Sequence, residues 1–118
     1  MRVPEYTQLS QKDLEAAEAL LAQGDYHQAS EKLWGAAAVM VKAIAEQRGW
    51  PHNGHRELNR AISRLAQETG QRELIRLFGS ASALHMNFYE DWLTPDQVTE
   101  LAASVRELLD ELRQLAVA

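Results

Sequence analysis

The sequence predicts an all-α fold, an up-and-down antiparallel bundle of four main helices plus a shorter one, in a single domain over residues 1–118. Three observations predict it. Apolar residues recur every three or four positions along most of the chain, which is the period of a helix with one buried face. No segment alternates apolar and polar residues over the length of a strand. The connections between the periodic segments are short, which favours antiparallel neighbours.

The first helix is expected from Ser10 to about Gln23. Ser10 is placed as its N-cap, because a serine hydroxyl can accept a hydrogen bond from a free amide of the first turn. Asp13 falls at the third helical position, where an acidic side chain is favourable. Gly24 is expected to end this helix.

The second helix is expected to begin after Asp25, its N-cap, and to end near Gly49, because Pro51 disfavours α geometry at Trp50. One face carries a seam suited to antiparallel packing: Tyr26, Ala29, Leu33, Ala37, Met40 and Ile44. A second apolar stripe runs beside it: Trp34, Ala38, Val41 and Ala45. The helix is therefore expected to be buried on two sides, either at the centre of the bundle or against another subunit.

The third helix is expected to open at Gly54 or His55 and to close near Gly70. A fourth helix follows at once, and one seam holds Leu74, Phe78, Ala81, His85 and Phe88. The fifth helix has a strong start signal, because Thr94 can cap it and Pro95 suits the first helical position. Its apolar face keeps strict spacing through Val98, Leu101, Val105, Leu108, Leu112 and Leu115.

Two stretches of small residues, 35–38 in the second helix and 79–83 in the fourth, each contain a glycine. A glycine inside a helix costs about 1 kcal/mol relative to alanine, so close backbone approach is the expected reason for each one. We predict that these segments cross each other, or cross their counterparts in a second copy of the chain. Leucine at Gly35 or Gly79 would then unfold the protein or change its oligomeric state.

The composition excludes several kinds of chemistry. There are no cysteines, so disulfides, thiolate zinc sites and thiol nucleophiles are excluded. The amino terminus lacks the apolar region of a signal peptide, and the longest apolar run, 33–41, is far shorter than a membrane span. We therefore expect a cytoplasmic protein that needs no cofactor.

The charge is acidic overall but unevenly placed. The net charge of −5 argues against a bulk electrostatic hold on nucleic acid. Residues 48–76, however, carry six arginines against three glutamates. Arg56, Arg60 and Arg64 lie four apart and form a basic stripe that could contact phosphate, although a solvated face paired with nearby glutamates is the more usual reason for such a stripe.

The densest polar cluster lies at the end of the fourth helix. His85 is the candidate catalytic residue, because an imidazole can act as a general acid or base near neutral pH, and Tyr89 and Asn87 are candidate ligand-binding residues beside it. The alternative is that His85 is a satisfied core histidine. A serine hydrolase that uses Ser82 and His85 is not predicted, because Ser82 lacks the strained turn that exposes the nucleophile in such enzymes.

Two other groups of residues are candidates for chemistry. His52, His55 and His85 lack the matched spacing of a metal site, so no metal site is predicted and the first two are expected to be solvated loop histidines. Glu31 and Lys32 flank the apolar block of the second helix. Structural pairing is their default role, and ligand binding beside His85 is the alternative.

Two segments carry a family resemblance. Residues 24–37 read GDYHQASEKLWGAA and residues 84–90 read LHMNFYE. Together they resemble the PaREP family of small archaeal and bacterial proteins, which is grouped with the HEPN superfamily, and the resemblance covers nearly the whole chain. It implies a HEPN-like helical bundle that is commonly dimeric.

The resemblance also bears on activity. Many HEPN proteins are ribonucleases of toxin–antitoxin systems or partners of small nucleotidyltransferases, and the nucleases carry an arginine, four to six residues and then a histidine. His85 matches that histidine, but Phe78, Gly79 and Ser80 occupy the positions of the arginine. Arg76 is nine residues before His85, which places it on the opposite face of the same helix, roughly 13 Å along the axis.

The sequence therefore leads to one main functional hypothesis and two alternatives. The main hypothesis is a non-catalytic, dimeric HEPN-like module that binds a nucleotide, RNA or a protein partner such as a nucleotidyltransferase, through Glu31, Lys32, Asn87 and Tyr89 beside His85. The first alternative is a divergent, metal-independent RNA endonuclease that uses His85. The second is a helical protein-interaction scaffold, although no repeat near 34 residues supports it.

Overall fold

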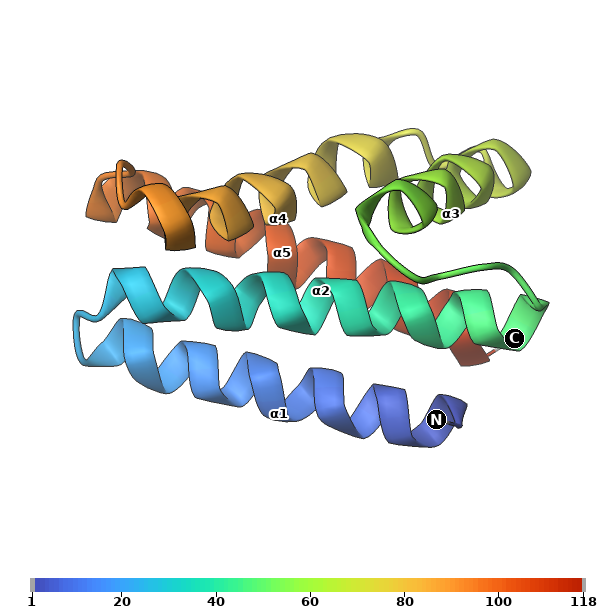
Figure 1. Ribbon diagram of the computed structural model, residues 1–118, viewed down its shortest axis with the longest axis horizontal. Coiled ribbons are helices and arrows are strands. Elements are labelled where there is room, and N and C mark those ends of the chain that lie inside the picture. Colours follow the sequence, from blue (N-terminus) through green and yellow to red (C-terminus); the bar gives the residue numbers. More distant parts are fainter. Residues whose placement is uncertain (1, 118) are drawn as a thin grey trace.

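A computed structural model describes residues 2–117 and contains five helices (Figure 1). Their bounds are α1 Val3–Ala22, α2 Tyr26–Arg48, α3 His55–Thr69, α4 Glu73–Glu90 and α5 Pro95–Val117. The described part of the chain contains no strand, so the predicted all-α fold is confirmed. None of its helices combines the length and the apolar composition needed to cross a membrane.

Helix α2 lies at the centre of the bundle. It packs against all four other helices, whereas α1 packs its backbone only against α2 (Figure 1). Helix α3 sits across one end, on α2 and α4, and α4 packs against α5. Both apolar stripes of α2 are buried except for Tyr26, which is partly buried, and this confirms that the helix is covered on two sides.

Most predicted helix ends are confirmed. The Asp25 side chain accepts a hydrogen bond from the amide of Gln28 at 3.1 Å. Helix α2 ends where Gly49 takes a left-handed conformation with φ of 71°, a geometry that glycine adopts without steric cost. At the start of α5, Thr94 and Gln97 exchange hydrogen bonds between side chain and backbone, so the predicted capping box forms.

The predicted start of the first helix is wrong. Helix α1 begins at Val3, with Pro4 in its first turn, where the missing amide costs nothing. Ser10 lies inside this helix and is fully buried. Its hydroxyl donates to the carbonyl of Ala36 at 2.7 Å, so it joins α1 to α2 and does not cap a helix end.

Helices α2 and α4 do pack on each other, but the close backbone approach between them that was the expected reason for each glycine is not found within one chain. A Cβ on Gly35 would lie 2.9 Å from the Asp13 carboxylate, so the close neighbour is a side chain of α1. A Cβ on Gly79 would meet nothing within 4 Å, and Gly79 is exposed on α4. The alternative, that Gly79 lies against a second copy, stays a prediction.

The carboxyl group of Asp13 lies partly buried beside Gly35. Burial raises the pKa of Asp13, and the nearby charge of Lys32 opposes that rise. A raised folded-state pKa means that the folded protein binds this proton more tightly than the unfolded chain. Protonation of Asp13 therefore adds to the free energy of unfolding. This contribution is complete at pH values below the pKa of Asp13 in the unfolded chain, and it is lost as the pH rises through the pKa of Asp13 in the folded protein.

Asp13→Asn is therefore expected to increase the free energy of unfolding at pH 7, because the amide removes a charge that burial disfavours. Urea unfolding at pH 7 and pH 3 measures this, and the gain should vanish at pH 3, where Asp13 itself is neutral. Asp110→Asn, an equal charge change on the exposed face of α5, is the control. A destabilised Asp13→Asn at pH 7 would contradict the prediction.

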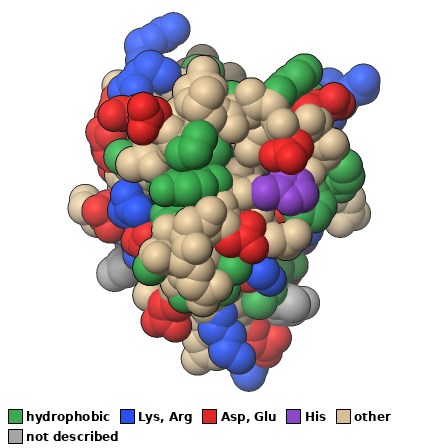
Figure 2. Space-filling model, turned by 90° about the vertical axis from the view of Figure 1, so that its left-hand side faces the viewer, with side chains coloured by type: hydrophobic (Ala, Val, Ile, Leu, Met, Phe, Trp, Pro, Cys, Tyr) green, Lys and Arg blue, Asp and Glu red, His purple; other side chains and the backbone are tan. Residues whose placement is uncertain are grey.

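Figure 2 views the end of the bundle that holds the α1–α2 and α4–α5 turns. Hydrophobic, acidic and basic side chains are intermixed there, and no single charge dominates. The exposed large hydrophobic side chains of the described chain are Leu9, Ile75, Met86, Tyr89 and Trp92. Four of these five come from α4 or from the turn that follows it.

Candidate functional site

A groove of about 360 Å³ opens between α3 and α4, with α2 as its floor. Its lining residues come from these three helices: Trp34, His55, Asn59, Ser82, His85, Met86 and Tyr89. The predicted site residues His85 and Tyr89 therefore share one groove. Aromatic and imidazole rings make up most of its wall.

His85 is held on three sides. Its Nδ1 lies 2.8 Å from Glu31 Oε1, and its ring stacks on Trp34 with 4.7 Å between centroids and 25° between planes. The Tyr89 ring meets it edge-on at 5.3 Å. An ionised carboxylate only accepts hydrogen bonds, so Nδ1 of His85 carries the proton and donates to Glu31. In the neutral ring, Nε2 is then left with a lone pair for a ligand.

His55 is the groove residue that the sequence analysis missed. It begins α3, and its ring lies 4.9 Å from that of His85 and 5.3 Å from that of Trp34. His55 is exposed to solvent, as expected, but it is the first residue of α3 and not a loop residue. His52 is also not a free loop side chain, because its Nε2 lies 2.7 Å from Glu46 Oε2.

Asn87 is buried, and its side chain makes hydrogen bonds that stabilise the fold. It is 1% exposed and does not line the groove. Its amide donates to Ser30 Oγ at 3.0 Å, and its carbonyl oxygen accepts from the backbone amides of Trp92 and Leu93 at 2.9 and 2.8 Å. These three bonds tie the end of α4 and the following turn to α2.

Lys32 is not brought to the groove. It is exposed, it does not line the groove, and its charge acts on Asp13 of α1. One residue along a helix turns the side chain by about 100°, so Glu31 and Lys32 serve different neighbours. Of the predicted ligand-binding residues, Glu31 and Tyr89 are the two that contact His85.

No lysine or arginine lines the groove among residues 2–117. Phe78 is buried against Trp34, with 5.6 Å between ring centroids. The described residues contain no group of three or more side chains placed to hold a metal ion. Within one chain, the groove therefore offers rings, hydroxyls, an amide and two imidazoles, without a cation from lysine or arginine.

The basic stripe lies elsewhere on α3. Arg56, Arg60 and Arg64 are all exposed. Arg64 makes a 3.5 Å ion pair with Glu68 and covers the Trp50 ring at 4.5 Å. His55 and Asn59 face the groove from a different side of the same helix, and none of the three arginines lines it. The stripe and the groove are therefore separate surfaces.

Comparison with known proteins gives a family and a fold. The model of the archaeal PaREP1/PaREP8 family matches residues 5–109. A crystal structure of a protein from Sulfolobus solfataricus is similar, with 25% sequence identity and a TM-score of 0.81, and the match covers 92% of this chain and 96% of that one. No protein with a curated functional description matches.

Proposed function

The chain belongs to the archaeal PaREP1/PaREP8 family, and from that premise we propose that it is a dimeric HEPN-like module that binds a nucleotide or an RNA base in the groove beside His85. One observation carries the proposal. An oriented imidazole, held by Glu31, lies in an open groove between a tryptophan, a tyrosine and a second histidine.

The groove fits a nucleobase better than a phosphate. Bases stack on aromatic and imidazole rings, and such stacking is worth roughly 1–3 kcal/mol per base. Tyr89 is 68% exposed, so its ring is accessible to a ligand, while Asn59 and Ser82 offer hydrogen bonds to a base edge. Phosphate recognition would need basic side chains, which the described groove lining lacks.

The dimer is proposed to form through the exposed face of α4. Five residues spaced by four, three, four and three positions make up this α4 seam: Ile75, Gly79, Ser82, Met86 and Tyr89. This spacing is typical of helices that pack along each other, and a small residue at the centre allows close approach. A Cβ on Gly79 would meet no neighbour within its own chain, so close packing against a second copy would explain why this position is a glycine.

The charges beside the seam favour an antiparallel pair of α4 helices. Arg72 and Arg76 lie at the amino-terminal end of the helix, and Glu90 and Asp91 lie at its carboxyl-terminal end, all exposed. An antiparallel crossing near Ala83 places arginines of each copy opposite acidic residues of the other, whereas a parallel crossing places like charges together. Such a crossing also puts the partner's α4 beside the groove, because Ser82, Met86 and Tyr89 belong to both surfaces, so in the dimer the ligand would bind between the two copies.

Gly79→Leu is expected to dissociate the dimer without unfolding the monomer, because the leucine has open space within its own chain but blocks a close helix crossing. Sedimentation equilibrium measures the dissociation constant, which should rise at least tenfold, and circular dichroism checks the helix content. Ala103→Leu, which adds the same side chain to the exposed face of α5, is the control. A monomeric wild-type protein, or equal dimerisation of Gly79→Leu, would overturn the proposed interface.

Ligand binding is tested with nucleosides, which carry no phosphate, and with short single-stranded RNAs of different base composition. A bound ligand raises the melting temperature of the wild-type protein, and His85→Ala is expected to weaken this binding by at least tenfold. His52→Ala removes a histidine outside the groove, and Lys32→Ala removes the lysine that faces α1. Both should bind as the wild type does. Binding that survives in His85→Ala, or the absence of any binding, contradicts the proposal.

A second function, metal-independent RNA cleavage, is favoured by the hydrogen bond between Glu31 and His85. In this alternative, Nε2 of His85 takes the proton of a ribose 2′-hydroxyl, whose oxygen attacks the adjacent phosphorus. The leaving 5′-oxygen receives a proton from His55, and the products are a 2′,3′-cyclic phosphate and a 5′-hydroxyl. The cation that the described groove lacks would come from the partner's Arg76 in an antiparallel dimer.

The two functions give different results with RNA in the presence of a chelator. The cleavage alternative requires turnover that is lost in His85→Ala and reduced in Glu31→Gln while both variants stay folded. Binding without turnover supports the module. If neither RNA nor nucleotides bind, a protein partner such as a nucleotidyltransferase becomes the ligand to test.

A further inference from the structure

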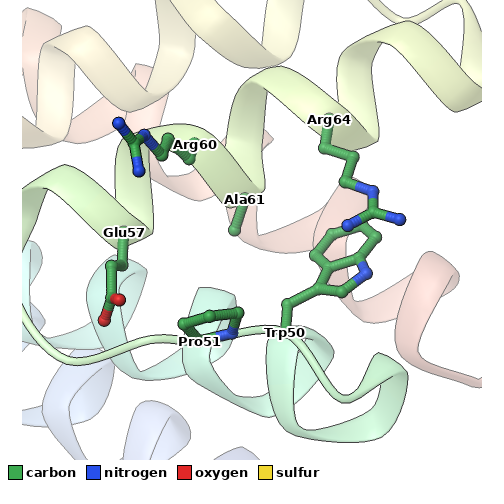
Figure 3. Close-up of a pocket in the computed structure, with 6 residues that line it drawn as sticks. All are labelled: Trp50, Pro51, Glu57, Arg60, Ala61 and Arg64. Atoms are coloured by element: carbon green, nitrogen blue, oxygen red, sulfur yellow. The ribbon is translucent and has the colours of Figure 1, made fainter.

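A second cavity, of about 240 Å³, lies between α3 and the segment that joins it to α2 (Figure 3). Its lining residues are Trp50, Pro51, Glu57, Arg60, Ala61 and Arg64. The residues of α3 among them share the side of the helix opposite to His55 and Asn59, since about 100° of rotation separates successive residues. This cavity is therefore independent of the groove beside His85.

The tryptophan wall of the cavity is held in place before any ligand binds. The backbone amide of Trp50 donates to the carbonyl of Ala45 at 2.8 Å, which anchors the residue just beyond the end of α2. The guanidinium groups of Arg64 and Arg48 lie 4.5 and 5.3 Å from the indole centre. Figure 3 shows Arg64 extended over the indole ring. Contacts of this kind between a cation and an aromatic face are favourable.

The charges around the cavity are not all neutralised. Glu68 pairs with Arg48 at 2.8 Å and with Arg64 at 3.5 Å. The carboxylate of Glu57 accepts a 2.6 Å hydrogen bond from the backbone amide of Asn53. Arg60 has no carboxylate partner among residues 2–117, although it lines the cavity. Its guanidinium remains available to an anionic group.

We propose that this cavity binds a small organic anion with a flat ring, a function that is separate from the groove. The guanidinium of Arg60 binds the carboxylate or phosphate of the ligand, with Arg64 beside it. The ring of the ligand packs on Pro51, Ala61 and the indole of Trp50. A guanidinium fork suits both anions, and the flat apolar wall suits an aromatic ring. Aromatic carboxylates and nucleoside monophosphates share this chemistry.

The experiment uses the indole N–H signals of the ¹⁵N-labelled protein, with the Trp50 signal assigned from a Trp50→Phe variant. Benzoate and AMP are titrated separately, with inorganic phosphate and adenosine as probes of the anion and the ring alone. Saturable shifts of the Trp50 signal are expected with benzoate, AMP or both. A shift with benzoate shows that the cavity accepts a carboxylate, and a shift with AMP shows that it accepts a phosphate. Phosphate and adenosine should bind at least tenfold more weakly.

Arg60→Ala is expected to weaken this binding by about 10- to 100-fold, because a hydrogen bond to a charged group is worth about 1.5–3 kcal/mol. Arg56→Ala makes the same charge change one turn away, outside the cavity lining, and should bind as the wild type does. His85→Ala should leave the Trp50 shifts intact, which separates this site from the groove. Equal losses in Arg56→Ala and Arg60→Ala, or no saturable shift with either anion, would overturn the proposal.

Discussion

Trp34→Ala is expected to lower the free energy of unfolding by about 3–5 kcal/mol, a large part of the 5–15 kcal/mol that stabilises a typical domain. Trp34 is 8% exposed and joins three helices. Its indole contacts Phe78 and His85 of α4 and His55 of α3, with 4.7–5.6 Å between ring centroids. Alanine removes these contacts and leaves a cavity beneath the groove. Urea unfolding followed by circular dichroism measures the loss.

Trp34→Phe is the matched control for this prediction. A phenyl ring keeps part of the packing against Phe78 and part of the stack with His85, so we expect a smaller loss than for alanine. Both variants should also weaken ligand binding, because the floor of the groove changes. A loss below about 1 kcal/mol in Trp34→Ala would show that this tryptophan is not part of the core.

Asn87→Ala is expected to lower the free energy of unfolding by about 3 kcal/mol. The substitution leaves the backbone amides of Trp92 and Leu93 without their acceptor and Ser30 without its donor. Each buried polar group without a partner costs roughly 1–3 kcal/mol. Chemical denaturation gives the total, and faster hydrogen exchange at the two amides locates its origin.

Two variants separate the parts of this network. Asn87→Asp keeps an oxygen that accepts from both amides, so it should lose less stability than Asn87→Ala. Ser30→Ala removes the acceptor of the Asn87 amide and the hydroxyl's own bond to the Tyr26 carbonyl, and it should cost about 1 kcal/mol. The losses in the double variant Ser30→Ala/Asn87→Ala should be less than additive, because the two side chains contact each other. Full additivity would contradict the network.

The sequence predicts the helices and their ends well where these depend on interactions between residues that are close together in the chain. Asp25 and Thr94 cap helices because an oxygen acceptor and a free amide lie within three residues of each other. The all-apolar segment of α2 predicts its central place, since such a segment needs neighbours on both sides. The wrong start of α1 has a physical reason. The Ser10 hydroxyl is used in a contact with Ala36, 26 residues away, which no local pattern reveals.

Only part of the candidate site can be predicted from the sequence, because the rest depends on contacts between residues that are far apart in the chain. His85 and Tyr89 are four residues apart on one helix, so their shared face can be recognised from spacing. His55 reaches the same groove from a helix that begins 30 residues earlier, and its packing on Trp34 depends on how α3 lies across α2. Lys32 lies near Asp13 of α1 and not in the groove, because one step along a helix changes which neighbour a side chain meets.

Helix α1 packs against one other helix, and this determines what is lost when α1 detaches from the bundle. Its backbone packs on α2 alone, and the side-chain link from Glu18 to Arg106 of α5 is partly exposed to solvent. Detaching α1 therefore disrupts one helix pair, whereas detaching α2 dismantles the whole assembly. Loss of α1 would therefore leave the packing among the other four helices in place.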